Sequence, residues 1–174
     1  MRRFHMAMGC LFLLSACTPS VFPYGTLDDV DPNFDFTDWQ LLPDQGPQRK
    51  IQLGGRILRT DIEGDTVKIV AAQLPIAKNP TDGPEEGKSL GEFVIFYRAM
   101  VDPLFLLKGN RVMVVGQTSH PTKIEVDTVQ RNLPTVTALC IHFWNAGGKD
   151  ILMQGSSGSD SKTLRELTYC ARAF

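Results

Sequence analysis

Histidine is scarce in this 174-residue sequence, and the three histidines present do not have the spacing of a metal site. His120 stands beside Pro121 in an expected turn, and His142 lies among apolar residues in an expected strand. Neither has a second histidine or a cysteine at the spacing of zinc ligands. We therefore expect both to have structural roles, and we expect no metal site.

Motifs that carry catalysis or hold cofactors are also missing. The stretch Gly155-Ser156-Ser157-Gly158 lacks the Gly-x-Ser-x-Gly spacing of a nucleophile elbow, and no glycine-rich phosphate loop is present. Asp102 directly precedes Pro103, which suits a helix N-cap better than a general base. The sequence therefore predicts a protein that is not an enzyme and has no cofactor.

A surplus of basic residues is absent as well. Lys and Arg total 18, whereas Asp and Glu total 19. Loss of residues 1–16, which include Arg2 and Arg3 but no acid, would lower the net charge from −1 to about −3. Binding of nucleic acid needs positive charge against the phosphate backbone, so we expect no such partner. No apolar run beyond the N-terminus approaches the length of a spanning helix.

The N-terminus has the features of a secretory signal. Arg2 and Arg3 precede an apolar run over residues 6–14, which is too short to span a bilayer as a stable helix. The run ends in Leu-Ser-Ala-Cys at residues 14–17, which resembles the lipobox of bacterial lipoproteins. This resemblance implies a helical signal peptide over residues 1–16 and a diacylglyceryl group on Cys17. The alternative is an ordinary signal peptide with an incidental cysteine.

Two of the four cysteines remain for other roles. Cys10 leaves with the signal and Cys17 would carry the lipid, so Cys140 and Cys170 are left as a pair. An oxidising compartment permits a disulfide between them without requiring one. Two separate buried thiols are the alternative.

Residues 17–50 contain many Pro and Asp residues and show no sustained period. We expect them to form a lipidated, solvated tether with a few aromatic contacts to the domain that follows. Residues 75–90 contain three prolines and two glycines, and they predict a long irregular loop.

Residues 51–146 have the alternating pattern of β-strands. The expected strands cover residues 51–62, 66–74, 93–97, 112–115, 123–128 and 135–144, with a hairpin turn at 63–65. About six short strands with short connections predict a mainly β domain. We expect a small antiparallel β-barrel, OB-like, or a sandwich.

Residues 147–174 predict a linker followed by a short C-terminal helix. Residues 155–159 are Gly and Ser, whereas Leu164, Leu167 and Ala171 fall on one helical stripe. In the strand before the linker, residues 136, 138, 140, 142 and 144 share one parity. A helix that covers this face would bring Cys170 close to Cys140.

Six short motifs occur in an order that resembles the Slp family of outer-membrane lipoproteins. They are Gly54-Gly55-Arg56-Ile57, Gln73-Leu74-Pro75, Gly91-Glu92-Phe93, Val101-Asp102-Pro103, Gly109 to Gly116, and Leu139 to Trp144. The likeness extends from about Leu53 to Trp144. This chain has Glu92 where the family usually has arginine, and Met113 where it has threonine.

The resemblance implies a non-enzymatic protein of the cell envelope, associated with starvation or stress. It implies an outer-membrane location in which a lipid on Cys17 is the link to the membrane and the domain faces the periplasm. An envelope protein or a glycan is the expected further partner. The alternative is a periplasmic binding module that uses one barrel face for an oligosaccharide or a protein.

Overall fold

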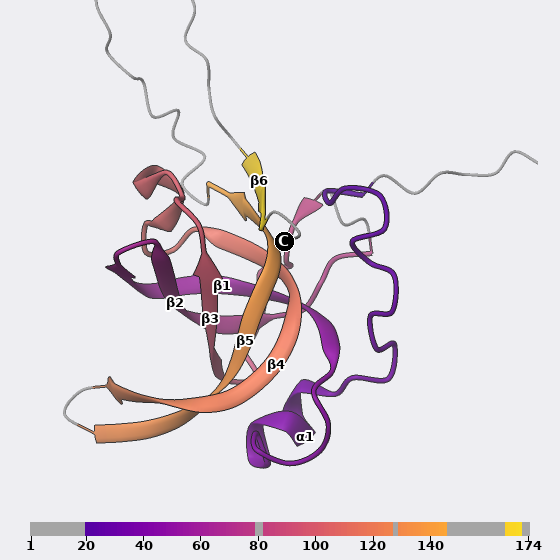
Figure 1. The fold of residues 1–174 in the computed structure, drawn as a ribbon, viewed down its shortest axis with the longest axis vertical. Coiled ribbons are helices and arrows are strands. Elements are labelled where there is room, and N and C mark those ends of the chain that lie inside the picture. Colours follow the sequence, from indigo (N-terminus) through magenta and orange to yellow (C-terminus); the bar gives the residue numbers. More distant parts are fainter. Residues whose placement is uncertain (1–19, 79–81, 127–128, 146–165, 172–174) are drawn as a thin grey trace, which may run out of the picture.

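Six β-strands form one sheet, and a short helix precedes them (Figure 1). The structure is a computed structural model that describes residues 20–78, 82–126, 129–145 and 166–171. The elements are α1 (Phe36–Leu41), β1 (Lys50–Glu63), β2 (Thr66–Leu74), β3 (Glu92–Arg98), the 3-10 turn η2 (Pro103–Leu106), β4 (Arg111–Val126), β5 (Val129–Trp144) and β6 (Glu166–Cys170).

The strands follow the order β3-β2-β1-β4-β5-β6, and all neighbours in that order are antiparallel. One further pairing joins β3 to β5 in parallel, between Val94–Phe96 and Thr135–Thr137. This pairing brings the sheet back on itself and makes it ring-like. The predicted mainly β class with about six strands is confirmed.

The predicted hairpin between β1 and β2 is confirmed. Glu63 pairs with Thr66, and the turn between them contains Gly64 at a φ of 63°. A residue with a side chain rarely adopts this left-handed conformation, whereas glycine does so at little cost. Local turn chemistry therefore fixes the register of the first two strands.

The main core fills the inside of the ring. Alternate residues of the strands point inward, as the period of two predicts. The fully buried members include Ile57, Ile69, Phe93, Ile95, Val114, Ile141 and Phe143. Two smaller clusters lie elsewhere, and one of them lies under the N-terminal segment.

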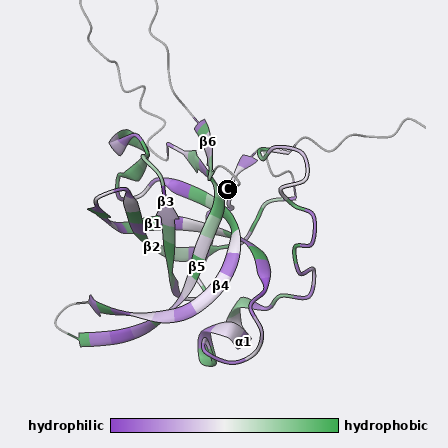
Figure 2. Cartoon of the chain, viewed as in Figure 1, coloured by the Kyte–Doolittle hydropathy of each residue, from purple (hydrophilic) through white to green (hydrophobic). Residues whose placement is uncertain are grey.

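The prediction of separate strands at 112–115 and 123–128 is wrong, because one long strand, β4, covers both. The register of β4 against β5 shifts between Ser119 and Thr122. Pro121 and Pro134 both lie in this irregular stretch, where a missing backbone N–H removes no ladder hydrogen bond. Pro121 therefore lies in a bulge of β4 and does not end that strand. Figure 2 shows that hydrophilic residues predominate in the distal part of this β4–β5 hairpin.

The prediction of a C-terminal helix is also wrong. Residues Glu166–Cys170 form strand β6, which pairs with β5 from Cys140 to Trp144. Leu167 and Ala171 are compatible with a helical stripe, but Thr168 and Tyr169 favour a strand. Pairing with the free edge of β5 favoured the strand over the helix. Leu164 and the Gly/Ser linker lie outside the described residues.

A bulge in β5 changes which face its side chains occupy. Val115 pairs with Cys140, whereas Gly116 pairs with Ala138, so Leu139 is an extra residue. A side chain on Gly116 would collide with the backbone of Thr137, which explains the glycine. Val136 and Ala138 therefore face the main core, while Cys140 and Trp144 face the opposite side. The single parity predicted for residues 136–144 is wrong for this reason.

The segment before β1 contains a helix that the sequence did not predict. Asp35 caps α1 by accepting hydrogen bonds from the backbone amides of Thr37 and Asp38. Phe36 and Trp39 are buried, and Phe36 packs against Phe93 with ring centroids 6.0 Å apart. The expected aromatic contacts to the domain are present, and α1 closes one end of the ring.

Candidate functional site

The N-terminal segment, residues 20–30, lies over the outer face of β4 and β5. Phe22 is buried against Met113, Val115, Cys140 and Trp144, which project from that face. We had expected the C-terminal element to cover this face. The N-terminal segment covers it instead, while β6 extends the sheet at the edge of β5. Cys17, the predicted lipidation site, lies just outside the described residues.

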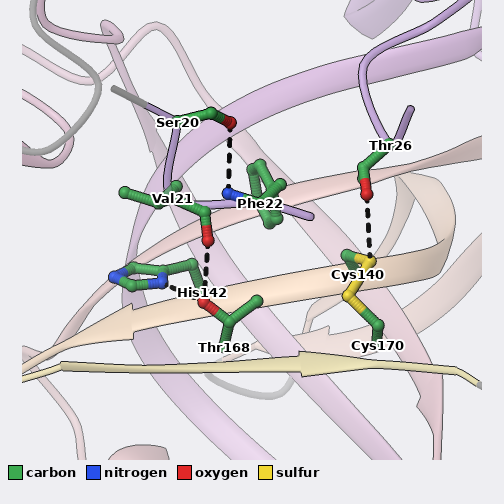
Figure 3. Close-up of a disulfide and its surroundings, with 8 residues drawn as sticks. All are labelled: Ser20, Val21, Phe22, Thr26, Cys140, His142, Thr168 and Cys170. Carbon is green, nitrogen blue, oxygen red and sulfur yellow. Dashed lines mark hydrogen bonds between the residues drawn. A yellow bond between two sulfur atoms is a disulfide. The ribbon is translucent and has the colours of Figure 1, made fainter. Parts of the chain in front are cut away.

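Cys140 and Cys170 face each other across β5 and β6 and form a disulfide in the structure (Figure 3). Their Cα atoms are 4.0 Å apart. The flanking pair is joined by a backbone hydrogen bond from Ala171 to Leu139, so the two cysteines occupy a non-hydrogen-bonded pair, where side chains come closest. The bridge fixes β6 to the sheet.

We call the surroundings of this bridge the β6 junction, which comprises Val21, Phe22, Cys140, His142, Thr168 and Cys170. Figure 3 shows Val21, Phe22 and Thr26 of the N-terminal segment over β5, close to His142 and the disulfide. The Thr168 hydroxyl donates to the Val21 carbonyl at 2.9 Å. The Thr26 hydroxyl lies 3.9 Å from the Cys140 sulfur. Three parts of the chain that are distant in sequence therefore meet at one place.

His142 is the buried polar centre of the β6 junction. Its Nδ1 lies 2.6 Å from the Thr168 hydroxyl oxygen. Because that hydroxyl gives its one hydrogen to Val21, it must accept the second bond, so the proton of His142 resides on Nδ1. The ring also contacts Phe22 and Trp144 edge-on.

The other ring nitrogen of His142 is buried and has no hydrogen-bond partner among the described residues. The nearest charged atom is a carboxylate oxygen of Glu166, 3.6 Å away on a largely exposed side chain. Burial lowers the pKa of His142 below its ordinary value, and the Glu166 carboxylate opposes this shift. The lowered pKa favours the neutral imidazole at pH 7, in which Nδ1 carries the proton.

The inner face of β6 makes a further contact with the ring. The hydroxyl of Tyr169 accepts a hydrogen bond from the backbone amide of Asp102 at 3.1 Å. The Asp102 carboxylate accepts from the amide of Leu104 and caps η2, as the sequence predicted. Asp102 is thus engaged in structure, and Tyr169 ties β6 to this turn.

A cleft of about 280 Å³ lies at the α1 end of the molecule. Its walls come from residues 33–35, residues 38–39, residues 42–49 and residues 118–120 of β4. His120 pairs with Asp44 at 2.7 Å across its surface, and both side chains are well exposed. Aspartate, amide and hydroxyl groups therefore surround an opening that α1 and β4 shape.

Within the described parts of the chain, no three His, Cys, Asp or Glu side chains are grouped so that they could hold a metal ion. His120 and His142 belong to different places, at the α1 end and at the β6 junction. A search of these same residues finds no helix that is long and apolar enough to cross a membrane.

Sequence reasoning missed the parts of the β6 junction that depend on contacts distant in sequence. Phe22 lies in a short stretch, Val21 to Tyr24, that is interrupted by Pro23 and shows no sustained period, so no pattern marked it as buried. Thr168 lay in the predicted helix, where its hydroxyl had no assigned partner. The strand-like alternation over residues 166–170 is the one signal that could have found it.

Comparison with known proteins gives one family and two individual similarities. The model of a family described as "Outer membrane lipoprotein Slp family" matches residues 14–157. An uncharacterized protein of Haemophilus influenzae is 26% identical over 96 residues, which is 55% of this chain. The chain spans about half of that relative, 52% of its length. The crystal structure of a small single-stranded DNA-binding protein from Streptomyces coelicolor has a TM-score of 0.37 and 13% identity, over 56% of this chain and 93% of that one.

Proposed function

Because the chain belongs to the outer membrane lipoprotein Slp family, we propose that it is a lipid-anchored envelope protein, acylated on Cys17, that works by binding and not by catalysis. Its location is the outer membrane, as membership of this family indicates. The first residue that matches the family is Leu14, which opens the Leu-Ser-Ala-Cys sequence.

The observation that carries the proposal is the family match over residues 14–157, and the docking of Val21 and Phe22 indicates what a lipid on Cys17 would hold. Phe22, five residues further on, is buried on the outer face of the sheet, and Val21 is hydrogen-bonded to Thr168. A lipid on Cys17 would therefore hold a folded domain close to the membrane. Two or more acyl chains on one residue are enough for stable anchoring, whereas one chain binds only weakly.

Metabolic labelling with a fatty-acid probe tests the anchor. We expect the wild-type protein to be labelled and the variant Cys17→Ser to be unlabelled. The matched control is Cys10→Ser, which removes a cysteine from the signal and should leave labelling intact. Equal labelling of the wild type and Cys17→Ser would refute acylation at this residue.

The association with starvation or stress rests on family membership alone. We expect more of the protein in the outer membranes of starved cells than in those of growing cells. Quantitative proteomics of the two membrane preparations measures this difference, with a constitutive outer-membrane lipoprotein as the reference. Equal amounts in both preparations would contradict the association.

A second candidate function is that of a binding module for an oligosaccharide of the envelope. The cleft at the α1 end favours it, because Asp, Gln and hydroxyl side chains are the groups that recognise sugars by hydrogen bonding. A titration with soluble peptidoglycan fragments, followed by amide chemical shifts, tests it. Shifts confined to the cleft would support this function, whereas no shifts there would reject it.

A further inference from the structure

Val21 and Phe22 attach the start of the described chain to strands β5 and β6 at the β6 junction. The backbone carbonyl of Val21 accepts from Thr168, and the side chain of Phe22 is 5% exposed. The amide of Phe22 also bonds to the Ser20 hydroxyl at 3.2 Å. The start of this segment is therefore fixed on the fold at one defined point.

The length of chain between that point and Cys17 is short. Four residue steps separate Cys17 from Val21, and a fully extended chain covers about 14 Å over four steps. An acylated Cys17 lies at the level of the lipid headgroups. Whatever path residues 18–20 take, Val21 and the β6 junction would then be within about 14 Å of that level.

The α1 end of the molecule lies on the far side from this attachment point. Figure 1 shows α1 and β6 at opposite ends of the sheet. After Phe22, consecutive turns bond Thr26 to Pro23 and Asp28 to Gly25, and Lys50 then fixes the carbonyl of Asp28. These contacts keep the segment on the outer face of the sheet and prevent it from acting as a long free tether.

We infer that the β6 end of the domain faces the lipid bilayer, and that the α1 end with its cleft faces away from it. This inference rests on the proposed acylation of Cys17. Tyr24 is fully exposed beside the point of attachment. A tyrosine in that place suits the membrane interface, because its ring is apolar and its hydroxyl remains hydrated.

The two tryptophans of the chain are built-in reporters of this orientation. Trp144 lies in the cluster under Phe22, whereas Trp39 lies in α1. The variant Trp39→Phe leaves only Trp144, and the variant Trp144→Phe leaves only Trp39. The lipidated, full-length forms are reconstituted in phosphatidylethanolamine vesicles that contain a dansyl-labelled headgroup, and energy transfer from tryptophan to dansyl is measured.

We expect strong energy transfer from Trp144 alone and weak transfer from Trp39 alone. Equal transfer, or stronger transfer from Trp39, would overturn the orientation. Intact mass shows beforehand whether each protein carries the lipid. A missing lipid would refute the proposed anchor, whereas a lipidated protein with the wrong transfer pattern would refute only the orientation.

A third variant tests the cause without touching the core. Fifteen Gly/Ser residues inserted between Pro19 and Ser20 would lengthen the connection between Cys17 and the domain by about 20 Å on average. We expect the difference in transfer between the two tryptophans to diminish in this background. An unchanged difference would show that something other than the short connection orients the domain, and would overturn the inference.

Discussion

Replacement of Phe22 by alanine is the most direct test of how firmly the N-terminal segment is attached. Phe22 has 5% of its surface exposed and belongs to the cluster of Met113, Val115, Cys140 and Trp144 on the outer face of the sheet. Burial of such a side chain stabilises a fold by about 1.5–3 kcal/mol, and the cavity left by truncation raises the cost of Phe→Ala to about 3–5 kcal/mol in a rigid core. Because residues 20–30 can partly collapse onto the gap, we expect about 3 kcal/mol.

The measurement is urea denaturation of the unlipidated mature chain carrying Cys17→Ser. In a parallel thermal denaturation, the same loss of about 3 kcal/mol should lower the melting temperature by about 6–12 °C for a domain of this size. The matched control is Tyr24→Ala, two residues away and fully exposed, which should change stability by less than about 0.5 kcal/mol. If both variants lose the same small amount, the N-terminal segment is not part of the folded core and the reasoning fails.

Three further predictions concern the rest of the fold. Removal of the bridge between Cys140 and Cys170, which are 30 residues apart, should cost about 3–4 kcal/mol, and non-reducing mass spectrometry should find no free thiol in the protein secreted into the periplasm. Because burial lowers the pKa of His142, the unfolded chain takes up its proton first, so stability should fall as the pH drops below about 6.5, as followed by denaturation at several pH values. Val114→Ala should cost about 2–4 kcal/mol in the main core, whereas Glu86→Ala on the exposed loop should cost almost nothing in the same assay.

Each of these predictions has an outcome that contradicts it. Two free thiols after export would rule out the bridge. The pH effect should disappear in a variant such as His142→Asn, so an unchanged pH profile in that variant would assign the effect to other groups. Similar losses at the core valine and at the loop glutamate would mean that the assigned core is wrong.

Local chemistry made part of the fold predictable. The hairpin at Gly64 and the cap at Asp102 depend on residues within one turn of each other, and both were found. The bulge at Leu139 was not found, because it appears only in the pairing of β5 with β4, where the β5 backbone lies so close to Gly116 that no side chain would fit there. The face of the sheet that each β5 side chain occupies therefore could not be deduced from the sequence of β5 alone.

The candidate site was predictable only in its components. The sequence singled out Cys140, Cys170 and His142, but it assigned the cover over them to a helix that does not form. The alternation over residues 166–170 spans only five residues and is a weak signal, so pairing with β5 decided the conformation. The contribution of Phe22 arises from packing across the whole length of the chain, which no local pattern encodes.

The hydrogen bond between Val21 and Thr168 joins residues that are 147 positions apart. Contacts of such long range form late, because the loop between the two residues must be closed first. If the chain is exported as proposed, the N-terminal segment would cross the membrane first, and its hydrogen bond to Thr168 could not form until residue 168 had followed. Phe22 packs against residues 113–144, which precede Thr168 in the chain, so its burial could begin before the Val21–Thr168 bond closes the contact.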